Sequence, residues 1–216
     1  NSLMQLNLAI YTPSNYIFSS KKEKYEDLYG RDMGNTFFRQ SDREMGIRRL
    51  ISINLLKRTE SSIHSFKLTV INIKNLIDST INSIGQFENI YSVLIDDMVG
   101  IEDLDFDDQN TDLFVGKKVK ISLKDIDTVS WAEELKADSE CLGKILESVN
   151  EITPEHDNKL QTLLRTIDSK LQNPINDNNK KIIIFTAFSD TSEYLYENVS
   201  VYVKEKYGLN TALISG

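Results

Sequence analysis

Two groups of polar side chains in this chain have the residue types that contact a phosphate. Lys57 and Arg58 stand together within an otherwise apolar helical pattern, and both can donate hydrogen bonds to phosphate oxygens. Thr186, Ser189 and Thr191 follow a short apolar run, where their hydroxyl groups could join the free amide groups of a helix N-terminus around an anion. Both groups are therefore candidate phosphate-contacting residues.

Each group also has an interpretation that needs no ligand. Lys57 can pair with Glu60 at a spacing of i, i+3 on a solvated helix face. Asp190 and Glu193 can form a capping box, in which the charge of Asp190 competes with a phosphate for the helix end. The residues by themselves leave both interpretations open.

Three alternating carboxylates suggest a calcium loop, but their spacing fails. Asp103, Asp105 and Asp107 alternate as calcium ligands do, whereas Asp108 stands where the loop needs glycine and Phe114 where it needs glutamate. These acids belong to residues 96–112, which hold eight acids and no Lys or Arg. Repulsion among like charges favours a solvated acidic loop there.

The composition limits the function further. A formal net charge of −8 argues against coating nucleic acid with the whole surface, but leaves room for a local basic face. The single Cys141 excludes an intramolecular disulfide and, with two histidines, favours a reduced, cytoplasmic setting without a metal cluster. No apolar run is long enough to span a membrane, and neither a phosphate loop nor a serine-nucleophile elbow occurs. The sequence therefore predicts no catalytic residue and no metal site.

The elements that must position these residues are mainly helical. From residue 41 onward, apolar residues recur at steps of three and four, and a third helix is expected over 160–171. The stripe over 63–87 spans roughly 40 Å, which is typical of an antiparallel coiled pair whose partner lies at 126–152. Residues 21–34 are expected to form a loop with at most one helical turn. The partner stripe consists of Ile126, Val129, Leu135, Leu142, Ile145, Val149 and Ile152.

The last forty residues predict a different architecture. Residues 182–186 read as a buried parallel strand, a helix follows until Gly208, and residues 211–216 read as a second strand. That order is the crossover unit of an open α/β sheet. Two parallel strands need further strands and helices to cover their edges and faces, so we expect the chain to be a piece of something larger.

Two segments resemble bacterial Swi/Snf-type superfamily-two helicases. Residues 53–66, INLLKRTESSIHSF, are similar to the Leu-Leu-Lys-Arg-x-Glu-Ser-Ser segment of that family. Residues 181–195, KIIIFTAFSDTSEYL, resemble the opening of its second RecA-like lobe. The resemblance implies a mainly α fold, in which a long antiparallel, coiled-coil-like arm precedes a partial βαβ unit. Residues 1–172 would be the helical inter-lobe region, and residues 173–216 would be the incomplete second lobe.

The resemblance also implies a function. The parent protein would be a cytoplasmic, bacterial, ATP-dependent DNA or RNA helicase or translocase that binds ATP and Mg²⁺ between its lobes. Its partners would be double-stranded DNA and the remaining motor lobes of the same chain. The present residues would contact the nucleic-acid backbone through Lys57, Arg58, Thr186, Ser189 and Thr191.

Because the ATP-binding motifs are missing from these residues, we expect them to bind no cofactor and hydrolyse no ATP on their own. The alternative interpretation is a helical coiled-coil module without catalytic activity, which binds a protein partner or forms a dimer.

Overall fold

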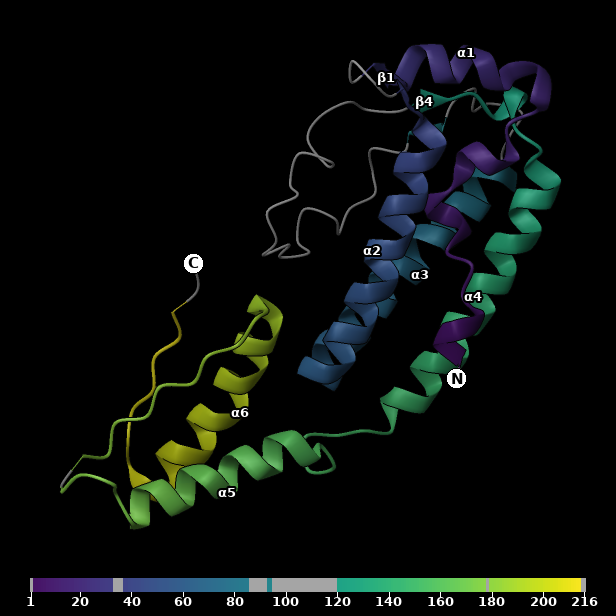
Figure 1. Ribbon diagram of the computed structural model, residues 1–216. Coiled ribbons are helices and arrows are strands. Elements are labelled where there is room, and N and C mark those ends of the chain that lie inside the picture. The colour runs from purple at the N-terminus through teal and green to yellow at the C-terminus, as the bar shows by residue number, and fades with distance from the viewer. Residues whose placement is uncertain (1, 33–36, 86–92, 95–119, 178, 215–216) are drawn as a thin grey trace. The chain divides into compact units, whose positions relative to one another are not determined.

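The computed structural model describes residues 2–32, 37–85, 93–94, 120–177 and 179–214 (Figure 1). Within these residues the chain is mainly α-helical, which confirms the coarse fold class predicted from the sequence. The acidic loop predicted at 96–112 lies outside the described residues. The elements are η1 (Ser2–Gln5), η2 (Ala9–Tyr11), η3 (Pro13–Tyr16), α1 (Ser19–Tyr29), β1 (Arg31–Asp32), β2 (Phe37–Phe38), α2 (Gln40–Ser61), α3 (Ile63–Gly85), β3 (Val93–Leu94), β4 (Lys120–Ile121), η6 (Leu123–Asp125), α4 (Thr128–Asn150), α5 (Asn158–Gln172) and α6 (Ser189–Tyr207), where η marks a 3₁₀ turn.

The chain divides into two compact units. The first consists of Asn1–Leu55 and Thr69–Leu146, and the second of Leu56–Leu68 and Glu147–Gly216. The short strands form two antiparallel pairs in the first unit, with Arg31 opposite Phe38 and Val93 opposite Ile121. The second unit therefore contains the end of α2, the start of α3, and all of α5 and α6.

In the first unit, the long helices pack around an apolar core, as their sequence spacing predicts (Figure 1). The predicted pairing of α3 with α4 is confirmed by polar contacts along their seam. Lys74 Nζ lies 3.0 Å from Ser139 Oγ, and that hydroxyl donates to Asp78 Oδ1 at 2.6 Å. Val129 and Ile152 are exceptions to the predicted stripe, because they are 69% and 38% exposed, and Ile152 lies beyond the end of α4 at Asn150. The buried core side chains include Ile47, Ile51, Leu55, Val70, Ile73, Ile77, Leu135, Leu142 and Ile145.

The N-terminal segment is held within the first unit by two buried carboxylates. Asp138 on α4 accepts from the backbone amides of Asn7 at 2.7 Å and Ala9 at 2.8 Å. Glu44 on α2 accepts from the backbone amide of Ser14 at 2.9 Å. The indole of Trp131 donates to the carbonyl of Ala9 at 3.1 Å. These contacts satisfy backbone groups that burial removes from water.

The loop predicted at residues 21–34 is wrong, because residues 19–29 form helix α1. The sequence there lacks an apolar stripe, so its periodicity does not indicate a helix. Helix α1 is stabilised instead by contacts with Asp125. The hydroxyl of the buried Tyr25 donates to this carboxylate at 2.7 Å, and Lys24 forms an ion pair with it at 2.9 Å. Contacts with a segment a hundred residues away therefore stabilise a helix that local propensity leaves undecided.

In the second unit, α5 and α6 pack through an apolar cluster. Asp157 caps α5 by accepting from the amides of Lys159 and Leu160. Helix α6 ends at Gly208, whose φ of 64° is a left-handed conformation that glycine adopts without steric cost. Both predicted helices are thus confirmed. The buried members of the cluster are Leu160, Ile167, Leu171, Tyr194, Val199 and Val203.

The two strands predicted around α6 are not formed by the described residues, and the last two residues of the second one, 215–216, lie outside them. Residues 182–186 and 211–214 have no strand partner among the described residues, so the predicted RecA-like βαβ unit is not supported. Most side chains of both segments are exposed, and those of Ile183 and Phe185 are 77% and 89% exposed. An apolar run becomes a strand only where neighbouring strands pair with its backbone, and no such strand is described beside it.

The contacts of Asp168 predict a pH dependence for α5–α6 packing. Lys206, Tyr202 and Tyr207 donate to this carboxylate at 2.6–2.7 Å and, led by Lys206, lower its pKa to about 2. A lowered pKa stabilises the fold above the unfolded value of about 4, and this contribution is lost as the pH falls towards 2. Urea unfolding should show Asp168→Asn less stable than the wild type at pH 7. The difference should disappear near pH 2, and a constant difference would contradict this linkage.

Candidate functional site at the α2–α3 junction

The first of the two similar segments forms a tight junction between α2 and α3. Helix α2 ends at Ser61 and α3 begins at Ile63, so only Ser62 separates them. The buried hydroxyl of Ser62 accepts from the amides of His64 at 3.1 Å and Ser65 at 3.5 Å, as the N-cap of α3. One of the two adjacent serines therefore sets the helix break, and the other remains available for contacts outside the junction.

Arg58 ties this junction to the start of α6. Its guanidinium forms an ion pair with Asp190, in the first turn of α6, and lies 4.6 Å from the ring centroid of Phe188. The Arg58 side chain is 5% exposed and that of Asp190 is 21% exposed. Asp190 also accepts from the amide of Thr191 at 2.8 Å, which places negative charge at the positive end of the helix.

Two hydroxyl contacts lie beside the ion pair. The hydroxyl of Thr191 lies 2.5 Å from that of Ser65 and 3.1 Å from that of Ser61. Thr191 and Ser65 are both buried, so the hydrogen bond between them is shielded from water. The start of α6 therefore contacts both the last turn of α2 and the first turn of α3.

An aromatic contact completes the site. The rings of His64 and Tyr194 stack with centroids 4.8 Å apart and an interplanar angle of 7°. The hydroxyl of Tyr194 donates to Asp157 at 3.1 Å, which links the site to the N-cap of α5. Burial raises the pKa of Tyr194, and the charge of Asp157 raises it further. Tyr194 therefore acts as a neutral, structural hydrogen-bond donor at physiological pH.

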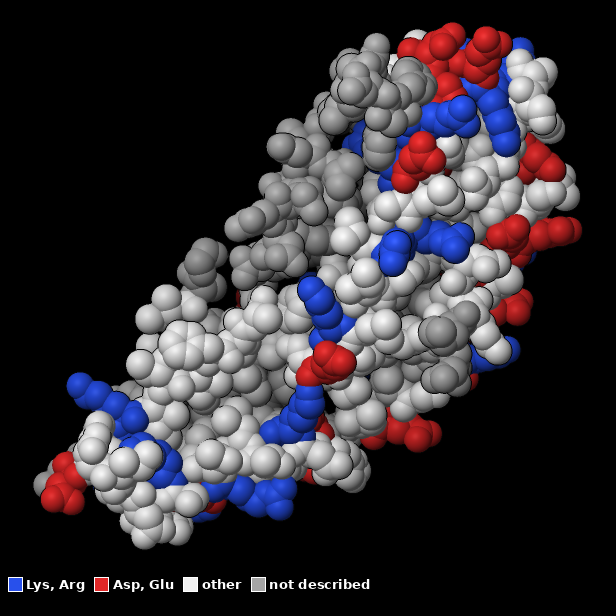
Figure 2. Space-filling model, in the orientation of Figure 1, with Lys and Arg blue, Asp and Glu red and all other residues white. Residues whose placement is uncertain are grey.

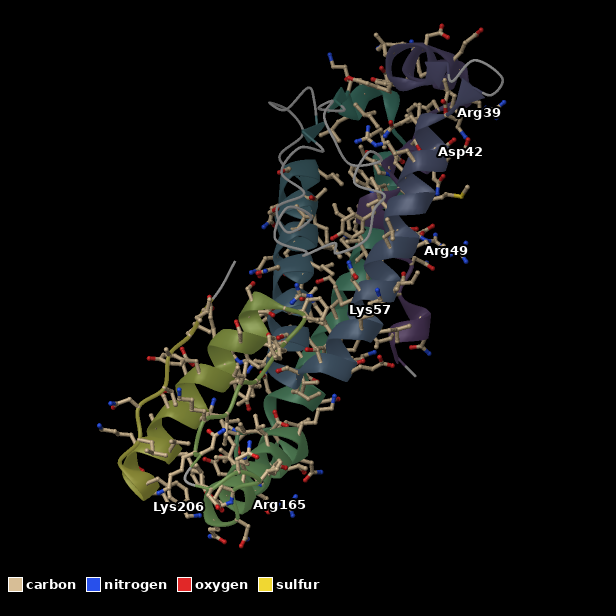
Figure 3. All side chains as sticks on the ribbon, turned by 60° about the vertical axis from the view of Figure 1, so that its left-hand side comes forward. Arg39, Asp42, Arg49, Lys57, Arg165 and Lys206 are labelled. Carbon is tan, nitrogen blue, oxygen red and sulfur yellow. The ribbon has the colours of Figure 1, made fainter. Side chains whose placement is uncertain are left out.

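The five predicted site residues have different surroundings. Arg58 and Thr191 are buried in the contacts just described, so binding a phosphate would require breaking those contacts. Lys57, labelled in Figure 3, is exposed, and Ser189 is exposed at the first position of α6. The hydroxyl of Thr186 donates to the carbonyl of Phe188 at 3.0 Å. Lys57 and Ser189 are thus the two predicted residues whose side chains face solvent.

The two specific contacts named in the ligand-free interpretations do not occur in the described residues. The N-cap of α6 is Phe188, with no side-chain cap, so Asp190 and Glu193 form no capping box. Lys57 and Glu60 are both exposed, and no ion pair between them occurs within the described ranges. The charge of Asp190 is instead matched by Arg58, a partner 132 positions away.

Sequence reasoning missed Ser62, Ser65, His64, Asp157 and Tyr194 as parts of this site. A signal existed for Ser62, because a serine before an apolar helical stripe is a preferred N-cap. No comparable signal exists for the contact of His64 with Tyr194, since periodicity describes one helix at a time.

Comparisons with protein-family models, curated proteins and solved structures find no match for this chain. In the described ranges, no helix is long and apolar enough to cross a membrane. The same residues contain no group of three or more His, Cys, Asp or Glu that could hold a metal ion.

Replacing Thr191 by valine tests the hydroxyl contacts. Valine preserves the shape but removes the hydrogen bonds to Ser61 and Ser65, so the free energy of unfolding should fall by about 1–2 kcal/mol. Ser189→Ala is the matched control, because Ser189 is an exposed hydroxyl in the same turn and its loss should change stability by less than about 0.5 kcal/mol. Equal urea midpoints for the two variants would show that the buried hydroxyl contributes nothing.

Proposed function

We propose that this chain is part of an ATP-dependent nucleic-acid translocase of the Swi/Snf type, and that its role is mechanical. Residues 1–172 join two RecA-like lobes in this proposal, and residues 173–216 begin the second lobe. Duplex DNA is the track, and ATP and Mg²⁺ bind in other parts of the motor. The present residues transmit movement between the lobes.

The observation that carries this proposal is the contact between the two segments that resemble the family. Residues 53–66 and 181–195 are more than a hundred positions apart, yet Arg58 pairs with Asp190, and Ser61 and Ser65 bond to Thr191. A chance resemblance at two separate sites would not require the matching residues to touch. The contacts support a shared role for both segments.

The exposed apolar run before α6 also supports the proposal. Residues 182–185 expose Ile182, Ile183, Ile184 and Phe185, which is a costly arrangement for a surface segment. Successive apolar residues suit a strand that is covered on both faces, as in a parallel sheet. Further strands of a motor lobe would cover this segment.

The proposed mechanical role follows from where the contacts lie. Only Ala187 and Phe188 separate residues 182–186 from the first turn of α6, so movement of that segment is passed to Asp190 and Thr191. Those residues are bonded to both sides of the α2–α3 junction, and α2 and α3 are 22 and 23 residues long. A displacement of the lobe must therefore move the helix ends or break a buried ion pair.

The residues present do not fit a nucleotide site. The sequence lacks a phosphate loop, and no carboxylate cluster suited to Mg²⁺ occurs in the part of the chain that the structure describes. We therefore assign no residue here to ATP or its metal, and no hydrolytic step.

Hydrolysis assays test this proposal. The purified chain should release no phosphate from ATP, with or without duplex DNA. A protein that contains this chain with both lobes should hydrolyse ATP faster when duplex DNA is added.

In that protein, Arg58→Ala should lower the DNA-stimulated rate of ATP hydrolysis roughly tenfold, because the lobe is then no longer tied to the junction. Arg49→Ala is the control, since Arg49 is an exposed arginine on the same helix. Turnover by the chain alone, or equal rates for both variants, would overturn the proposal.

The described contacts give little support to the alternative of a helical interaction module. The apolar stripes of α3 and α4 face each other within the first unit, so most of their side chains are already buried. Sedimentation of the purified chain distinguishes the two ideas: a monomer is expected for an inter-lobe region, and an obligate dimer for the module.

A further inference from the structure

Residues 7–14, which we call the strap, pass between α2 and α4 in the first unit (Figure 1). The strap is buried, because residues 8–11 are each at most 5% exposed. Asp138 of α4 binds its start, and Glu44 of α2 binds its end. The attachment of the strap therefore depends on two carboxylates from two different helices.

The start of the strap has a strained conformation. Leu8 has φ 51° and ψ 46°, a left-handed conformation that costs free energy in a residue with a side chain. The amides on either side of it, of Asn7 and Ala9, donate to the two oxygens of Asp138 at 2.7 and 2.8 Å. The indole of Trp131, the single tryptophan, donates to the carbonyl of Ala9 at 3.1 Å. These hydrogen bonds stabilise a backbone conformation that is unfavourable by itself.

The end of the strap is bound by Glu44. The Oε2 atom of Glu44 accepts from the amide of Ser14 at 2.9 Å and from the hydroxyl of the same residue at 2.5 Å. The Oε1 atom of Glu44 lies 3.0 Å from Nε2 of Gln40, whose own Oε1 is buried without a partner among the described residues. When the Gln40 amide turns over, its oxygen can accept a hydrogen bond from the protonated form of Glu44.

Both carboxylates are buried without a cation. Glu44 is 1% exposed and Asp138 is 2% exposed, and neither forms an ion pair with a residue of the described ranges. Other acidic side chains gather on the surface, as Figure 2 shows along α4. Because a buried charge without a cation is costly, burial raises the pKa of both groups despite their hydrogen bonds. The charge of Glu134 raises the pKa of Asp138 further, and that of Glu26 on α1 raises the pKa of Glu44.

Two further titratable groups lie near Asp138. Burial and, to a smaller extent, the charge of Asp138 raise the pKa values of Tyr16 and Cys141, so both groups are neutral at about pH 7. The cations Arg48 and Lys144 lower these two pKa values slightly, but neither forms an ion pair with Asp138. The neighbouring groups therefore do not compensate the charge of the buried carboxylate.

We propose that residues 7–14 are a proton-coupled strap, which binds tightly when Glu44 and Asp138 are protonated and loosens when both are charged. The inference goes beyond the proposed function and does not depend on it. A carboxylate whose pKa is raised by folding stabilises the bound strap below the unfolded value of about 4, and this contribution is lost as the pH rises through the folded value. The strap should therefore loosen from acidic towards alkaline pH.

Amide hydrogen exchange of the whole chain tests this proposal. The exchange rates of residues 7–14, divided by the intrinsic rate at each pH, give the equilibrium constant for opening of the strap. Between about pH 5 and about pH 8, this constant should rise at least roughly tenfold, because one unit of raised pKa corresponds to a factor of about ten. The fluorescence of Trp131 should shift to longer wavelength over the same range, since its indole loses the bond to Ala9. A constant that stays level or falls would overturn the proposal.

Neutral variants of nearly the same shape identify the groups that take up the protons. Glu44→Gln should remove part of the rise in the opening constant, and Glu44→Gln combined with Asp138→Asn should remove all of it. If the double variant does not fold, Glu44→Gln by itself still decides the question. A full rise in Glu44→Gln, or in the folded double variant, would contradict the assignment to these two carboxylates.

Asp125→Asn is the matched control. Asp125 is a buried carboxylate of the same unit, but its hydrogen bond and ion pair with Lys24 lower its pKa. Its contribution to stability is present at neutral pH and lost only in acid, so Asp125→Asn should keep the rise in the opening constant that the wild type shows. Loss of the rise in this variant as well would indicate a general loosening of the first unit and would overturn the role of the strap carboxylates.

Discussion

Replacing Arg58 by alanine is expected to destabilise the second unit by about 3 kcal/mol. Removing one partner of a buried ion pair leaves the other charge without compensation, which costs about 3–5 kcal/mol when both are fully buried. Asp190 is 21% exposed, so the lower end of that range applies. The contact of Arg58 with the ring of Phe188 is lost as well.

Amide hydrogen exchange is the suitable measurement, because the effect should be local. A loss of about 3 kcal/mol in the free energy of unfolding raises the equilibrium constant for local opening more than a hundredfold in α6 and residues 56–68. The single tryptophan, Trp131, lies in the first unit, and its fluorescence reports whether that unit is disturbed. An increase in exchange confined to the second unit would agree with the assigned ion pair.

The neighbouring residue provides the control. Lys57 carries the same charge one position earlier but is exposed, so Lys57→Ala should change the stability by less than about 0.5 kcal/mol. A double-mutant cycle with Asp190→Ala then isolates the coupling between Arg58 and Asp190. If Lys57→Ala destabilises as much as Arg58→Ala, or the cycle shows no coupling, the ion pair is not what holds the junction.

Replacing Tyr194 by alanine is expected to cost about 3–4 kcal/mol. Tyr194 is a buried member of the apolar cluster, so truncating its ring leaves a cavity between α5 and α6. The same change removes the stacking on His64 and the hydrogen bond to Asp157. Urea unfolding followed by helical circular dichroism should show the loss as a lower midpoint for the second unit.

Two variants separate the contributions of Tyr194. Tyr194→Phe keeps the ring and removes the hydroxyl, so it should cost about 1 kcal/mol. Tyr196→Ala removes an exposed tyrosine two positions along the same helix and should have an effect below about 0.5 kcal/mol. A Tyr194→Phe variant as unstable as Tyr194→Ala would show that the hydroxyl, and not the packing, dominates.

Much of the helical architecture could be predicted from the sequence. The spacing of apolar residues indicated the facing stripes of α3 and α4, the third helix α5 and the helix that ends at Gly208, because each is a repeating pattern along one element. Helix α1 could not be predicted in this way, because its stability depends on the hydrogen bond between Tyr25 and Asp125, and sequence periodicity gives no information about contacts between distant residues.

The prediction of the candidate site from the sequence was limited for the same reason. Lys57 and Arg58 are adjacent cations in the sequence, and helix geometry turns one to solvent and the other towards Asp190. That difference decides which of them can meet a phosphate, and it depends on a partner 132 residues away. The strands expected at 182–186 and 211–216 also needed neighbours, because backbone pairing is a property of at least two segments.

By itself, the sequence determined the helical class, the order of the long helices and the positions of the two segments that resemble a motor. Only the tertiary structure decided that these segments touch and that Arg58 is a buried ion-pair partner. The reason is physical. Periodicity encodes which side of one element is apolar, whereas charge pairing and grooves arise from side chains that folding brings together from distant positions.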